Sequence, residues 1–128
     1  MHKGFLSAAA LIGAIAVILG AFGAHALKAV LDEQALITYE TAVRYQFYHV
    51  FALALTGILY GNWPDPRLKL AGRFFITGIV LFSGSLYLLT YAHAAGISGL
   101  RFLGPVTPLG GAFLIAGWLM LFLGIRKK

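Results

Sequence analysis

The chain has 128 residues, of which 60% are hydrophobic and 11% are charged, with a formal net charge of +6 and no cysteine. A soluble domain of this length could not hide so much apolar surface, and its charged share would be about twice as large. The composition therefore excludes an ordinary soluble protein, and the lack of cysteine excludes disulfides, thiol nucleophiles and thiolate metal sites. The length allows one domain, which we expect to cover residues 1–128.

Four stretches without Asp, Glu, Lys or Arg follow one another along the chain, at residues 4–24, 45–63, 74–93 and 103–125. Each is close to the roughly 20 residues that a helix needs to cross a hydrocarbon core about 30 Å thick. Small residues recur in these stretches at helix-packing spacing, as in the pair Gly57 and Gly61, and they let neighbouring helices approach closely. The predicted fold class is an all-α integral membrane protein, an antiparallel bundle of four transmembrane helices.

The gap between the first two spans is long, and residues 32–44 predict an extra helical segment there. Asp32 has a side chain suited to an N-cap, and Glu40 precedes Arg44 by four residues, a spacing that favours an ion pair on a helix. If the segment continues into the second span, the helix from Glu33 to Gly61 is about 43 Å long. It would then either project from the membrane or bend into the interface.

The basic residues divide unevenly between the two sides that four spans define. Seven of them lie before the first span, between the second and third spans, or after the fourth span. The other three, Lys28, Arg44 and Arg101, lie on the opposite side together with the extra helical segment. Because short cytoplasmic loops carry an excess of Lys and Arg, both termini are expected to be cytoplasmic and the extra segment to be on the outer side.

Unusual polar residues gather toward the outer ends of the predicted spans. The candidate outer-face polar site consists of His25, Glu40, Arg44, Tyr45, Tyr48, His49, His93 and Arg101. Polar groups within a membrane usually face the bundle interior and find partners there, so ordinary hydrogen bonding between helices is one hypothesis. The others are a metal or haem on the histidines, a lipid phosphate on the arginines, and catalysis by a histidine. No HxxxH or HExxH pair supports a metal, and we predict no cofactor, no metal and no catalytic residue.

Four sequence patches match a known family in order along the chain: GAFGAHAL at 20–27, YETAVRYQFYH at 39–49, FSGSLY at 82–87 and GPVTPLGG at 104–111. The chain thereby resembles the YgdD/YwdK family of small four-helix inner-membrane proteins, which has mitochondrial relatives and no known function. The resemblance runs essentially end to end. It implies four spans in the inner (plasma) membrane, and it implies no activity, substrate or cofactor.

Two functional hypotheses remain open. The first is a non-enzymatic membrane protein that supports membrane integrity or assists a partner as an accessory or assembly factor. The second is an outer-face binding protein or enzyme that acts on a lipid, a quinone or a metal, and it requires His25, Arg44, His49 and His93 to converge on one pocket. Membrane lipids, a second copy of the chain or another membrane protein are the expected partners. Nucleic acid is not expected, because the basic residues lie where lipid headgroups would meet them.

Overall fold

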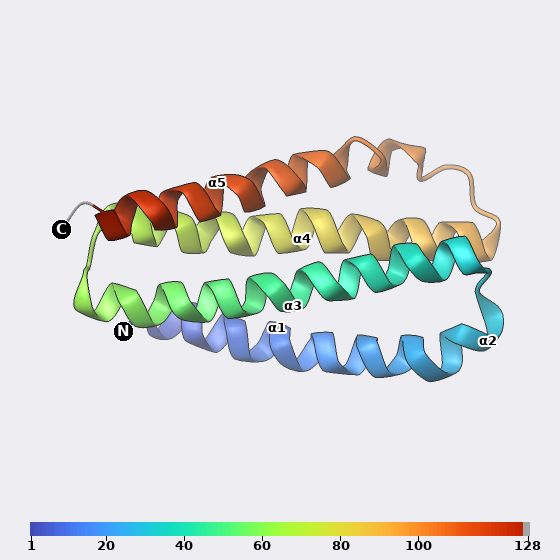
Figure 1. Cartoon of the computed structure of the whole chain (residues 1–128). Coiled ribbons are helices and arrows are strands. Elements are labelled where there is room, and N and C mark those ends of the chain that lie inside the picture. The colour runs from blue at the N-terminus through green and yellow to red at the C-terminus, as the bar shows by residue number, and fades with distance from the viewer. Residues whose placement is uncertain (127–128) are drawn as a thin grey trace.

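This computed structural model describes residues 1–126 and contains four long helices, each antiparallel to the next one along the chain (Figure 1). They are α1 (Lys3–Phe22), α3 (Glu33–Asn62), α4 (Pro66–Ala95) and α5 (Val106–Arg126). Residues 1–126 contain no strand, so the predicted all-α class is confirmed. Met1 and Arg126 lie at one end of the molecule, called here the terminal end, and the α1–α3 and α4–α5 connections lie at the other, called the loop end (Figure 1).

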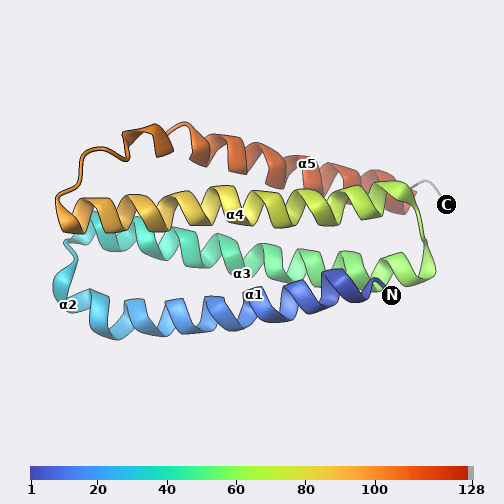
Figure 2. The same cartoon turned by 180° about the vertical axis from the view of Figure 1, so that it is seen from behind.

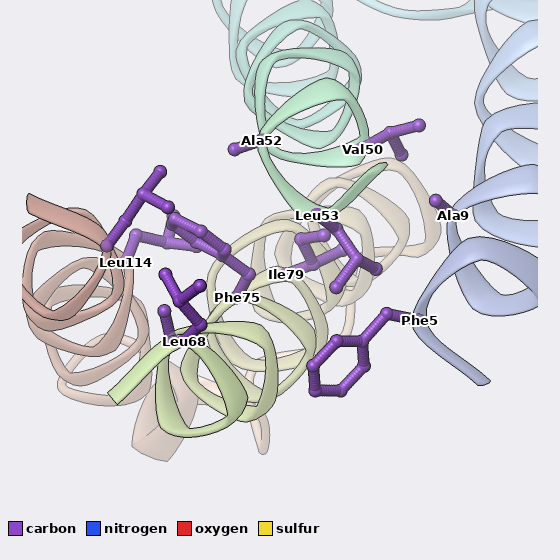
Figure 3. Packing of buried hydrophobic residues seen from close by; sticks show 11 residues of the cluster. Phe5, Ala9, Val50, Ala52, Leu53, Leu68, Phe75, Ile79 and Leu114 are labelled. Atoms are coloured by element: carbon purple, nitrogen blue, oxygen red, sulfur yellow. The ribbon is translucent and has the colours of Figure 1, made fainter. Parts of the chain in front are cut away.

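The central pair of helices is α3 and α4, and α1 and α5 lie on opposite sides of it, as the two views in Figures 1 and 2 show. The buried apolar side chains come from all four long helices and gather between them (Figure 3). Phe5 of α1, Leu53 of α3, Phe75 of α4 and Leu114 of α5 belong to this cluster. The core is therefore built around the α3–α4 contact.

The first helix extends beyond residue 24, the end of the predicted first span. α1 continues into a π-helical turn, Gly23–Leu27, and then into the short helix α2, Lys28–Val30. The chain turns at Leu31, which is extended, and Asp32 then caps α3 by accepting a hydrogen bond from the Ala35 N–H at 2.8 Å. The N-cap predicted at Asp32 is confirmed.

The segment predicted at residues 32–44 is the first part of α3 and continues without a break into the rest of that helix. Ala35, Tyr39, Ala42 and Gln46 recur every three or four residues and are all buried. Because this spacing puts them on one face of the helix, the segment packs along its neighbours instead of lying flat across the end of the bundle.

Glycines determine how closely α4 and α5 pack. Leu114 of α5 occupies the space left by Gly78 of α4, where a Cβ atom would lie 2.7 Å from its Cγ. In the opposite direction, Phe75 of α4 occupies the space left by Gly117 of α5, at 2.7 Å from a Cβ there. Since each of these side chains needs a neighbour without a side chain, the glycines set the register of the two helices.

Three helical segments are long and apolar enough to cross a membrane: Lys3–Ala29, Pro66–Ala95 and Arg101–Arg126. The fourth long helix, α3, is more polar, because it carries Glu40, Arg44 and Gln46 within its length. The structure thus supports a membrane protein with at least three spanning helices.

Candidate functional site

Three contacts define one level across the bundle, called here the reference level. Gly20 of α1 lies against Val43 of α3, with 3.4 Å between a Cβ at Gly20 and Val43 Cγ1. Ser83 Oγ of α4 donates a 2.7 Å hydrogen bond to the carbonyl of Ala42 in α3. Gly110 of α5 lies against the α4 backbone just before Ser83. These residues of the four helices therefore lie at about the same height.

The predicted site residues are spread widely along the bundle axis. From the reference level toward the loop end, His93 is ten residues further along α4, which at about 1.5 Å per residue is roughly 15 Å. Arg101 precedes α5 and lines the same cavity as His93. Arg44, next to the reference level, and Glu40, one turn nearer the loop end, are therefore well separated from His93 and Arg101.

His49 is buried and bonded at both ring nitrogens. Its Nδ1 lies 2.8 Å from the Tyr45 carbonyl, and its Nε2 lies 3.0 Å from Nε1 of Trp118 on α5. An indole N–H can only donate, so Nε2 accepts and Nδ1 carries the proton that is donated to Tyr45. This network assigns His49 as a neutral imidazole with no nitrogen free for a metal or a substrate.

A chain of hydrogen bonds crosses the bundle from α4 through α3 to α1. The Tyr87 hydroxyl of α4 donates to Gln46 Oε1 at 2.6 Å, and Gln46 Nε2 donates to the Ile12 carbonyl of α1 at 3.0 Å. The predicted outer-face polar site included neither Gln46 nor Tyr87. A signal was available in the sequence, because polar groups inside membrane-spanning stretches need partners.

The π-helical turn of the first helix is held by two side chains. The Tyr39 ring lies on Gly23, where a Cβ would come within 2.5 Å of Cε1, and its hydroxyl donates to the Leu19 carbonyl at 2.6 Å. His25 Nδ1 lies 2.9 Å from the Ala21 carbonyl, to which it donates. A π-turn disturbs the regular hydrogen bonds of the helix, and the Tyr39 hydroxyl and His25 Nδ1 donate hydrogen bonds to carbonyls beside the turn. His25 is thus bonded within its own helix.

His93 pairs with Asp32 at the loop end. His93 Nε2 lies 2.7 Å from Asp32 Oδ2, and both side chains are more than half exposed, at 58% and 59%. The hydrogen bond from the Ala35 N–H and, next, the one from His93 hold the pKa of Asp32 below its usual value. The pair joins the start of α3 to the end of α4, a contact that the sequence did not predict.

Glu40 and Arg44 line a groove between α1 and α3, called here the α1–α3 groove. Its volume is about 230 Å³, and its lining is completed by Gly20, Gly23, Ala24, Tyr39 and Val43. The ion pair expected between Glu40 and Arg44 is not formed, because no contact within 4.0 Å joins them in the described part of the chain. Both side chains are exposed on the outside of the bundle.

The predicted site residues therefore fall into separate groups. His93 and Arg101 line a cavity of about 440 Å³ at the loop end, while Arg44 lines the α1–α3 groove. Tyr45 packs against Tyr48 and His49, at ring distances of 5.7 and 6.2 Å. His25, Arg44, His49 and His93 do not converge on one pocket. Within residues 1–126, no three His, Asp or Glu side chains are grouped to hold a metal.

This fold and these contacts define a helical membrane protein in which several polar side chains form hydrogen bonds between helices. The chain belongs to the family described as "Protein of unknown function (DUF423)", whose model matches residues 19–111. This match and the relatives named as membrane proteins confirm the predicted family and confirm that the chain is a membrane protein.

Several relatives are similar to the chain over nearly its whole length. The UPF0382 membrane protein SH2409 of Staphylococcus haemolyticus is 39% identical, over 98% of this chain and 97% of the relative. The UPF0382 membrane protein YwdK of Bacillus subtilis is 36% identical over 98% of both chains. A UPF0382 membrane protein of Haemophilus influenzae is 35% identical over 100% of this chain and 98% of the relative. No solved structure matches the chain.

Proposed function

We propose that the chain is a non-enzymatic protein of the inner (plasma) membrane that supports membrane integrity or assists a membrane partner. The observation that carries this proposal is how the polar side chains within the bundle are used. Tyr39, Gln46 and Ser83 each donate to a backbone carbonyl of a neighbouring helix. Every buried polar side-chain atom in residues 1–126 has a hydrogen-bond partner. The buried polar groups are therefore engaged within the bundle.

The proposed membrane position follows from the length of the helices. α3 and α4 have 30 residues each, so they are about 45 Å long and exceed a hydrocarbon core of about 30 Å. Lys3, Arg67 and Arg126 lie 16 or 17 residues from the reference level toward the terminal end, which is roughly 24 to 26 Å. With these three cations at one boundary of a core about 30 Å thick, the other boundary falls near Glu40, and Arg44 lies about one turn inside it.

This position makes α3 the second of four spans. Its charge-free stretch begins just after Arg44 and reaches Asn62. Two polar groups of that stretch, Gln46 and His49, are buried and bonded to other helices, so they do not face lipid. The loop-end parts of α3 and α4, with Asp32 and His93, then project from the membrane on the outer side.

The basic residues at the terminal end support cytoplasmic termini through the positive-inside rule. Single-cysteine labelling tests this arrangement, because the chain contains no natural cysteine. Gly99→Cys at the loop end should react with a membrane-impermeant maleimide in intact cells. Asn62→Cys at the terminal end should react only after the membrane is opened. Labelling of both variants in intact cells would contradict the four-span proposal.

The role in membrane integrity predicts a barrier defect in cells that lack the protein, measured as entry of a membrane-impermeant dye. The unsubstituted chain should restore the barrier, and so should His25→Ala and His93→Ala, because these side chains bond only locally or at the loop end. A normal barrier without the protein would contradict this role. Failed rescue by a stably inserted His93→Ala would favour the second hypothesis, a binding or catalytic site at the outer face.

A further inference from the structure

The α1–α3 groove carries two opposite charges that the bundle leaves unused. Arg44 and Glu40 have no ion-pair or hydrogen-bond partner among residues 1–126, whereas the nearby Tyr39, Gln46 and Ser83 are bonded across the helices. A guanidinium at the edge of hydrocarbon is costly without an anion, and such residues usually pair or mark a binding site. The groove therefore needs a partner from outside the bundle.

The order of the two charges along the membrane normal is defined by the helix. Glu40 precedes Arg44 by four residues, so it lies about 6 Å nearer the loop end. A partner that satisfies both groups must carry an anion at the level of Arg44. It must also carry, a few ångströms nearer the loop end, a cation that can donate hydrogen bonds to Glu40. The headgroup of phosphatidylethanolamine has this order, with its phosphate next to the acyl chains and its ammonium group beyond it.

The walls of the groove suit a lipid. Gly20, Gly23 and Ala24 of the first helix present almost no side chain to it, and Tyr39 forms its base with the hydroxyl already bonded to Leu19. A lipid with its headgroup on Arg44 could therefore lay an acyl chain along α1, toward the terminal end, without meeting a large side chain in the groove. The guanidinium offers a planar set of five N–H donors, which matches two phosphate oxygens.

We propose that the α1–α3 groove is a binding site for phosphatidylethanolamine, with the phosphate on Arg44 and the ammonium group on Glu40. The proposal rests on the membrane position proposed above, which brings Glu40 to the headgroup layer and Arg44 about one turn below it, where its long side chain can reach outward to a lipid phosphate. It differs from general attraction of anionic lipid, because Glu40 disfavours a second negative charge and selects a cation that can donate hydrogen bonds. Phosphatidylcholine carries a cation without N–H donors, and phosphatidylglycerol carries none.

Native mass spectrometry of the full-length protein tests the site, with each of the three lipids added in turn to the same detergent. The unsubstituted chain should bind phosphatidylethanolamine about tenfold more strongly than phosphatidylcholine or phosphatidylglycerol, as expected for one charge-assisted hydrogen bond. Glu40→Gln should remove this preference while binding of all three lipids continues. Arg44→Gln should weaken all three, and Arg44→Lys should restore part of the binding.

Three further variants test the place of binding. Ala24→Leu should fill the groove and reduce binding with both charges still present, whereas Ala14→Leu, on an exposed part of α1 outside the groove, should bind as the unsubstituted chain does. Arg101→Gln removes an arginine at the loop end and should leave the preference unchanged.

Several outcomes would overturn the proposal. These are equal binding of the three lipids by the unsubstituted chain, a preference that survives both Glu40→Gln and Ala24→Leu, and equal losses for Arg44→Gln and Arg101→Gln. An Arg44-dependent dimer without bound lipid would also overturn it, because a second copy would then occupy the groove. Cysteine labelling reports the membrane position independently, so a wrong position and a wrong ligand can be told apart.

Discussion

Gly110 and Gly111 are neighbours in α5, and the structure predicts opposite effects when each is replaced by alanine. A Cβ at Gly110 would lie 2.8 Å from the carbonyl carbon of Leu81 and equally close to Cα of Phe82, which are backbone atoms of α4. No rotamer change can relieve this overlap, so the two helices must separate. A Cβ at Gly111 would meet only the Phe82 ring, at 3.8 Å, an ordinary contact.

The magnitudes follow from two opposing effects. Replacing a helical glycine by alanine removes backbone entropy from the unfolded chain and stabilises by about 0.5–1 kcal/mol. Overpacking typically costs about 1–3 kcal/mol, and a clash with backbone belongs at the upper end of that range. Gly110→Ala should therefore destabilise by roughly 2 kcal/mol, whereas Gly111→Ala should stabilise by about 0.5 kcal/mol.

The assay is unfolding of the purified protein by sodium dodecyl sulfate in mixed micelles, followed by tryptophan fluorescence. Trp118 is a suitable reporter because it lies on α5 against Phe75 of α4, with 5.4 Å between ring centroids. The unfolding midpoint should fall for Gly110→Ala and stay or rise for Gly111→Ala. Equal shifts for the two variants would refute the inferred α4–α5 register, since one residue along a helix would then make no difference.

Three further predictions use the same purified protein. The pKa of Asp32 is lowered in the folded state, so its stabilising contribution is complete above the ordinary value of about 3.9 and is lost as the pH falls through the lowered pKa. The unfolding midpoint of the natural chain should drop in this acidic range relative to Asp32→Asn, and parallel pH profiles would contradict the lowered pKa of Asp32. Gln46→Leu should cost roughly 1–2 kcal/mol in the detergent titration, because it removes the hydrogen bonds to the half-buried Tyr87 hydroxyl and to the Ile12 carbonyl; an unchanged midpoint would argue against the hydrogen-bond chain. Trp118→Phe should cost about 1 kcal/mol and change the nitrogen NMR shifts of His49, and unchanged shifts would remove that bond.

The local features of the helices could be predicted from the sequence. Asp32 accepts from an N–H only three residues away, so the chemistry of the cap is contained in a few neighbouring residues. The sequence also allowed the segment at 32–44 to continue into the second span, because helix-forming residues continue from Glu33 into the second apolar stretch. The ion pair expected from the spacing of Glu40 and Arg44 was wrong, because correct spacing permits such a pair without requiring it.

The partners across helices could not be predicted in the same way. His49 bonds to Trp118, which is 69 residues away, and His93 bonds to Asp32, which is 61 residues away. Each pairing depends on the register and rotation of two helices, and a sequence repeat along one helix contains neither. The prediction of one outer-face group therefore combined residues that the structure divides between the loop end, the α1–α3 groove and the bundle interior.

The sequence by itself determined that the chain is helical and lies in a membrane, because apolar stretches of about 20 residues have few other stable solutions. It also determined the caps and the family. Only the tertiary structure decided which polar groups are used within the bundle and which remain for a partner. The physical reason is that glycine contacts such as Gly20 on Val43 and Gly110 on α4 set the helix register. With this register, His49 and Gln46 form hydrogen bonds inside the bundle, and Arg44 lies at its surface.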